Sequence, residues 1–116
     1  MKTFGRTLLL QDDAQKIALY KRHHQTVWPE VLAALRRTGI VDMKIFLIGR
    51  RMFMVATTTD DYDAVRAGEA YLSEPRVQDW EELMRTLQEP APESRPGEWW
   101  AEMELVFDME WPQHRS

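Results

Sequence analysis

Tyr20 and His24 place a phenol and an imidazole four residues apart in the amino-acid sequence. Residues at this spacing lie on the same face of an α-helix, so the two rings are expected side by side. The helix should end at Trp28, because the residue before a proline, here Pro29, is pushed out of the α region. An imidazole titrates near neutral pH and is suited to general acid–base catalysis. This helical face is therefore the candidate active site.

The same spacing also fits two satisfied core side chains, and it does not by itself separate the two interpretations. His23 adjoins His24 but points about 100° away from it on a helix, so one of the pair is expected in solvent. A metal site needs further ligands, and the third histidine, His114, lies near the end of the chain. No metal site is predicted.

Carboxylates and indoles supply the other candidates. Glu81, Glu82, Glu102 and Glu104 could each act as a general base, but a solvated position is the expectation for Glu82 and Glu102. Trp80 lies on the apolar face of its predicted helix, where a core side chain is the more frequent role. The residues alone therefore favour a pocket that contains an imidazole and a phenol, without identifying a base.

Composition excludes several other function classes. The chain lacks cysteine, which excludes disulfides, thiolate zinc sites and a cysteine nucleophile. It contains no glycine-rich phosphate loop, nucleophile elbow or dinucleotide fingerprint, so no cofactor is predicted. A net charge of −4 argues against a nucleic-acid partner, and no apolar run approaches the roughly 18 residues that span a membrane. The N-terminal residues lack a signal-peptide core, and a cytoplasmic protein is expected.

Apolar periodicity predicts the elements that must hold these side chains. The expected order is strand, helix, strand, strand, helices and strand. Asp12 or Asp13 should cap the first helix, and Thr59-Asp60-Asp61 the helix after the hairpin. The strongest alternation of apolar and polar residues predicts the last strand. The expected strands are residues 4–10, 40–48, 52–58 and 99–107, the helices begin near residues 14, 29, 61 and 75, and residues 89–97 form a loop.

This order is typical of a ferredoxin-like α+β sandwich, βαββαβ, in one domain of residues 1–110 with a C-terminal tail of residues 111–116. Apolar residues occur on both faces of the second and third strands. Because helices cover only one face of such a sheet, the other face should pack against a second copy of the chain. A homodimer of the dimeric α/β-barrel type is predicted.

The motif Tyr20-x-x-x-His24-x-x-x-Trp28-Pro29-Glu30, followed by Gly39, resembles the L-rhamnose mutarotase family of sugar-anomer epimerases. The resemblance continues through residues 77–84, Val-Gln-x-Trp-x-x-x-Met, and through the Val-Phe pair at residues 106–107. It covers nearly the whole chain. It implies a ferredoxin-like dimer that interconverts sugar anomers without a cofactor or a metal.

The resemblance also implies roles for individual residues. It makes His24 the proton donor and Tyr20 a sugar contact, with further substrate contacts at Met43, Trp80 and Glu81. The rhamnose pattern has tyrosine at the position of Met43 and tryptophan at that of Glu81. The segments 79–84, 96–100 and 103–104 are instead similar to the branch described as L-fucose mutarotases. The implied substrate is a 6-deoxy-L-hexose monosaccharide, L-fucose before L-rhamnose.

The competing interpretation is a ferredoxin-like dimer that binds a small ligand or acts as a cofactor-free monooxygenase, because one fold supports many functions. The two interpretations differ in what they require of Tyr20, His24 and Trp80. A mutarotase needs these side chains in one enclosed pocket, whereas a binding module could scatter them.

Overall fold

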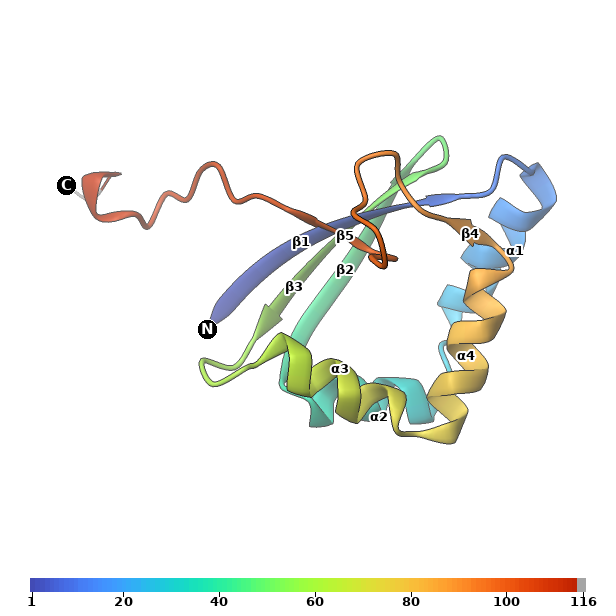
Figure 1. Cartoon of the computed structure of the whole chain (residues 1–116), viewed down its shortest axis with the longest axis horizontal. Helices are drawn as coiled ribbons and strands as arrows, with labels where there is room; N and C mark the ends of the chain where they lie inside the picture. The colour runs from blue at the N-terminus through green and yellow to red at the C-terminus, as the bar shows by residue number, and fades with distance from the viewer. Residues whose placement is uncertain (115–116) are drawn as a thin grey trace.

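The structure, a computed structural model, describes residues 1–114 and consists of one antiparallel sheet with four α-helices on one side of it (Figure 1). Within these residues the strand order is β2-β3-β1-β4, and β5 pairs with β1 as well. The elements are β1 (Lys2–Leu10), α1 (Ala14–Gln25), α2 (Pro29–Arg37), β2 (Ile40–Ile48), β3 (Arg51–Thr58), α3 (Ala64–Leu72), α4 (Pro75–Arg85), β4 (Gln88–Glu89), β5 (Ala101–Met103) and the 3₁₀ turn η1 (Pro112–His114). The predicted α+β class is confirmed.

Side-chain caps and prolines set the helix starts. The Asp13 carboxylate accepts hydrogen bonds from the backbone N–H groups of Gln15 and Lys16, which confirms one of the two predicted caps. For α3, however, the cap is Asp63, so the predicted cap at Thr59-Asp60-Asp61 is wrong. Five residues, 59–63, separate β3 from α3, and the helix begins later than predicted. Prolines open α2 and α4, where the missing N–H has no helical partner to lose.

The hydrophobic core lies between the helices and one face of the sheet. Alternate residues of β1 and β3 point inward, and the fully buried side chains include Leu8, Leu10 and Met52. Val31 of α2 and Val77 of α4 pack against them from the helical side. Figure 1 shows α1 and α4 along one end of the sheet and α2 with α3 along the other. Both helix pairs must therefore contribute to any site between the two layers.

The opposite face of the sheet is largely bare. The rings of Phe46 and Phe53 stack there with centroids 6.2 Å apart, and Phe46 is 56% exposed. Ile48, at the end of β2, is 81% exposed. Within a single chain the sheet does not close on itself. An exposed apolar face of this kind marks an interaction surface.

The last strand differs from its prediction. The alternation over residues 99–107 predicts a long strand, but β5 covers only Ala101–Met103, opposite Gly5 to Thr7 of β1. Alternating apolar and polar residues indicate that one face of an extended segment is apolar and the other polar. A β-strand also needs a neighbouring strand to which its backbone can hydrogen-bond. Beyond β5 the chain leads away from the sheet (Figure 1), with Leu105 and Phe107 exposed.

Residues 88–89, partly inside the predicted loop, form the short strand β4 against Leu9 and Leu10 of β1. Its location follows from the end of α4 at Arg85, because only two residues separate this helix from β4.

Of the predicted tail, residues 115–116 lie outside the described residues. Among residues 1–114, the helices are all too short or too polar to cross a membrane.

Gly39 joins α2 to β2 at a φ of +106°, and a Cβ there would lie 2.9 Å from Thr59 Oγ1 and 3.3 Å from Tyr62 Cδ1. Gly39→Ala should therefore lower the free energy of unfolding by about 1–3 kcal/mol, measured by urea denaturation. Gly68→Ala is the matched control, because no neighbouring atom lies within 4 Å of its Cβ position inside α3. It should stabilise the protein by about 0.5–1 kcal/mol. Equal effects of the two changes would contradict this account of Gly39.

Candidate active site

A cavity of about 460 Å³ lies between the helices and the sheet, and side chains from β1, β2, β3 and all four helices line it. The residues predicted for the site converge on it. Its walls include Tyr20, His24, Met43, Trp80 and Glu81. The convergence is the arrangement that the enzyme interpretation requires and that a scattered binding surface lacks.

Tyr20 and His24 lie one turn apart on α1 with their rings stacked, 4.0 Å between centroids. His24 Nδ1 lies 2.9 Å from the backbone oxygen of Tyr20. Because a carbonyl oxygen can only accept, Nδ1 donates this hydrogen bond, and in the neutral ring Nε2 carries the free lone pair. Burial lowers the pKa of His24, so the neutral ring is favoured. The ring is thus oriented by its own helix, and Nε2 is its free proton-transfer atom.

Trp80 holds this imidazole from the side. Its indole meets the His24 ring edge-on at a centroid distance of 5.3 Å and the Trp28 indole at 5.2 Å. Trp80 is only 4% exposed, so it is both a core residue and a cavity wall. His23 touches Trp80 edge-on at 6.2 Å but does not line the cavity. Of the two adjacent histidines, His24 is the one at the site.

Glu81 is half-buried on α4, and its Oε1 accepts a hydrogen bond of 2.8 Å from the Tyr71 hydroxyl of α3. Burial raises the pKa of Glu81, while the Tyr71 hydrogen bond and the charge of Arg85 oppose this effect. Glu82 and Glu102 are exposed, as predicted. Glu81 is therefore the carboxylate that reaches the cavity, and it is not a residue of a solvated helical face.

The Tyr20 hydroxyl lies in a network with Gln88 and Trp99. Trp99 Nε1 donates a 2.8 Å hydrogen bond to Gln88 Oε1, which leaves the amide N–H group of Gln88 for Tyr20. Burial strongly raises the pKa of Tyr20, the Gln88 hydrogen bond opposes this, and the charge of Glu81 adds to it. Tyr20 therefore stays protonated at neutral pH, as a hydroxyl that can both donate and accept.

The model of the family described as L-rhamnose mutarotase matches residues 3–109 of this chain.

The chain belongs to the L-rhamnose mutarotase family.

Relatives agree with this membership, and a solved structure agrees with the fold. An L-fucose mutarotase of Xanthomonas campestris pv. campestris is 43% identical over 100 residues, which cover 84% of this chain and 80% of the relative. An L-rhamnose mutarotase of Paraburkholderia phymatum is 30% identical over 79 residues, 66% and 69% of the two chains. The crystal structure of an L-rhamnose mutarotase from Formosa agariphila has a TM-score of 0.70 at 23% identity and covers 95% of this chain and all of its own.

Membership confirms the predicted resemblance and the predicted enzyme class, an isomerase. Tetracenomycin F2 cyclase from Streptomyces glaucescens also matches, with a TM-score of 0.64 and 16% identity over 97% of this chain and all of its own. At that identity the likeness concerns the fold alone. The cyclase therefore gives no argument about the function of this chain.

Sequence reasoning missed several residues of the cavity, among them Arg6, Tyr71, Gln88 and Trp100. Arg6 could have been found, because it alternates with Leu8 on the inward face of β1. Its guanidinium lies 4.4 Å from the centre of the Phe4 ring. Tyr71 carries no comparable signal. It reaches Glu81 only because α3 and α4 pack together.

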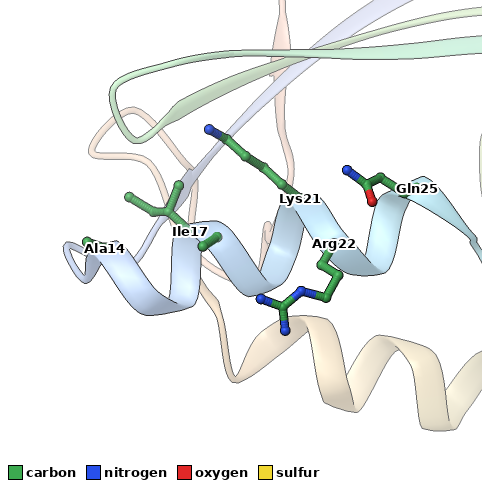
Figure 2. A pocket seen from close by; sticks show the side chains of 6 residues that line it. Ala14, Ile17, Lys21, Arg22 and Gln25 are labelled. Carbon is green, nitrogen blue, oxygen red and sulfur yellow. The ribbon is translucent and has the colours of Figure 1, made fainter.

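A second hollow, on α1, is not a rival site (Figure 2). It is lined by residues of α1 alone, among them Ile17, Lys21 and Arg22. Figure 2 shows the Lys21 and Arg22 side chains pointing away from one another, and the residues that line the hollow include neither a carboxylate nor an imidazole. Among residues 1–114, no group of three histidine or acidic side chains could hold a metal ion. Of these two hollows, the cavity of His24 is the one that brings an imidazole, phenols and a carboxylate together.

Proposed function

We propose that the protein interconverts the α and β anomers of a 6-deoxy-L-hexose, L-fucose in preference to L-rhamnose. The observation that carries the proposal is the convergence of His24, Tyr20, Trp80 and Glu81 on one cavity. Family membership supports the reaction, since the named relatives are sugar mutarotases. A cavity of about 460 Å³ accommodates a monosaccharide.

The reaction needs proton transfer and no redox step. In the ring-opening direction, an acid protonates the ring oxygen as its bond to the anomeric carbon breaks, and the anomeric hydroxyl loses its proton to give the open-chain aldehyde. Rotation and the reverse steps then form the other anomer. We assign the acid role to His24, whose Nδ1 is held by the Tyr20 carbonyl so that Nε2 can deliver and recover the proton. Because its pKa is lowered, the imidazolium is a stronger acid than a free one.

The cavity walls suit a deoxysugar. The indole of Trp80, supported by Trp28, offers an apolar surface for the C–H groups and the methyl group of such a sugar. Tyr20 and Glu81 offer hydrogen bonds to its hydroxyls. Met43 of β2 faces them with a flexible apolar side chain. Apolar and polar walls thus meet around one ligand-sized space.

Glu81 and Met43 support L-fucose over L-rhamnose. Both differ from the rhamnose pattern, and together they make the cavity less aromatic and more acidic. A site built to hydrogen-bond one hydroxyl discriminates strongly against a sugar that leaves its polar group unpaired. The greater identity to the Xanthomonas L-fucose mutarotase, 43% against 30% for the Paraburkholderia L-rhamnose mutarotase, points the same way.

We also propose that the working form is a homodimer. The bare sheet face carries Phe46, Ile48 and Phe53 as exposed side chains, and the helices of residues 1–114 lie on the other side of the sheet. Packing two such faces together would bury the stacked phenyl rings and would convert two open sheets into a closed two-sheet arrangement. The exposed apolar residues after β5, such as Leu105 and Phe107, add to the surface that a second copy could cover.

His24→Ala should slow anomer exchange by about 10²–10⁴-fold, the usual loss of a general acid, without unfolding the protein. Exchange NMR of the anomeric protons of L-fucose measures this rate. His23→Ala is the control, since His23 does not line the cavity, and it should retain most of the activity. A large loss in His23→Ala together with normal exchange in His24→Ala would reverse the assignment.

The unmodified protein should exchange L-fucose faster than L-rhamnose, and Glu81→Gln should reduce that preference, because the carboxylate selects among sugar hydroxyls. The same NMR measurement on both sugars gives the ratio of rates. Glu82→Gln, a change of the exposed neighbouring glutamate, should leave the ratio unaltered. Faster exchange of L-rhamnose by the unmodified protein would refute the choice of sugar while leaving the reaction type intact.

Sedimentation at micromolar concentration should give twice the chain mass, and Phe46→Asp should give monomers because it places a charge in the bare sheet face. Val65→Asp is the matched control, since Val65 is a 71% exposed apolar residue on α3, away from that face. It should remain dimeric. A monomeric unmodified protein would rule the dimer out.

A further inference from the structure

The hydrogen bond between Tyr71 and Glu81 connects two helices through the wall of the cavity. The Tyr71 hydroxyl, on α3, lies 2.8 Å from Glu81 Oε1, on α4, and both side chains line the space that His24 and Tyr20 line. The two residues are ten positions apart, with the break between the helices in between. The bond fixes where the carboxylate lies relative to the other walls.

Oε2 of the Glu81 carboxylate remains to accept a hydrogen bond from a ligand, because Oε1 already accepts one from Tyr71. A carboxylate has two oxygens and accepts about four hydrogen bonds. In the described part of the chain, Tyr71 is the hydrogen-bond donor to Glu81, and Oε2 accepts none. A half-buried carboxylate oxygen at the wall of a cavity favours a ligand that brings hydroxyl donors. A sugar is such a ligand.

We propose that Tyr71 is a positioning residue that holds Glu81 through Oε1, so that Oε2 receives one particular hydroxyl of the sugar and the pair sets the sugar preference. This inference rests on the proposed mutarotase function and adds to it the residue that orients the selecting carboxylate. Tyr71 itself need not touch the substrate. It acts through Glu81.

Electrostatics keep both partners in the required form. Burial, and then the charge of Glu81, raise the pKa of Tyr71, so its hydroxyl remains a donor over the whole working range. The Tyr71 bond favours the charged form of Glu81 and opposes the rise in its pKa that burial causes. The charge of Arg85, on the same helix, also acts on Glu81, and the charge of Glu81 acts on Tyr20 of α1. The other charged or titratable side chains that line the cavity are His24 of α1, Arg6 of β1 and Tyr62.

Tyr71→Phe tests the proposal, because it removes one hydroxyl and keeps the ring that packs against the core. Loss of the hydrogen bond should raise the pKa of Glu81, seen by NMR of the ¹³C-labelled side-chain carboxyl. The acidic limb in the pH profile of the L-fucose preference should move to higher pH, because less of the selecting carboxylate of Glu81 is then ionised at a given pH. The preference for L-fucose over L-rhamnose should fall by about five- to tenfold, the effect of one hydrogen bond.

Ser73→Ala is the matched control. Its hydroxyl donates a hydrogen bond to the Ala70 carbonyl at the end of α3, and Ser73 does not line the cavity. Ser73→Ala should therefore leave the pKa of Glu81, the pH profile and the sugar preference unchanged. In the double variant Tyr71→Phe/Glu81→Gln, the preference should equal that of Glu81→Gln alone, because Tyr71 acts only through the carboxylate.

A purely structural role for Tyr71 would change the unfolding free energy but not the pH profile or the preference. Active Tyr71→Phe protein with an unaltered profile and preference would therefore overturn the inference and leave the proposed function standing. An additive loss of preference in the double variant would overturn it too. If the unmodified protein exchanges neither sugar, the proposed function fails, and the role of Tyr71 fails with it.

Discussion

The burial of the Trp80 indole between α1 and α2 is the contact on which the rest of the site depends. Trp80 is 4% exposed and meets both His24 and Trp28 edge-on, so the core of the protein and the wall of its cavity are one aromatic cluster. Aromatic side chains bury a large area and prefer such edge contacts. The packing that stabilises α4 therefore also holds the His24 ring. Under the proposed function, stability and activity would therefore be coupled at Trp80.

Three polar groups of the cavity, on His24, Tyr20 and Glu81, are each oriented by a partner from the protein. The Tyr20 carbonyl holds Nδ1 of His24, the Trp99–Gln88 pair holds the Tyr20 hydroxyl, and Tyr71 holds Glu81. Polar groups in an apolar site need partners, since an unpaired one is costly. The same bonds remove rotational freedom, which is the preorganisation that acid–base catalysis requires. The three pairs connect α1, α3, α4, β4 and the segment before β5 around one space.

The two faces of the sheet differ in how their apolar side chains are shielded from water. The chain's own helices cover one face, and the cavity is the space left between them and the sheet. The other keeps Phe46 and Phe53 at the surface, although burying such side chains would stabilise the protein by about 1.5–3 kcal/mol each. In the proposed homodimer, a second copy of the chain would supply the matching apolar area. The cavity and the exposed apolar face thus lie on opposite sides of the sheet.

The sequence by itself determined the features that depend on neighbours along the chain. The shared face of Tyr20 and His24, the helix break at Pro29 and the hairpin of β2 and β3 follow from local spacing and backbone restriction, and the family motif extended them to Met43, Trp80 and Glu81. Only the tertiary structure decided the partners of these side chains. Tyr71 for Glu81 and Trp99 for Gln88 are set by how helices and sheet pack, and β5 is short because strand length depends on a hydrogen-bonding neighbour. Periodicity records which face a residue occupies, but not what lies opposite it.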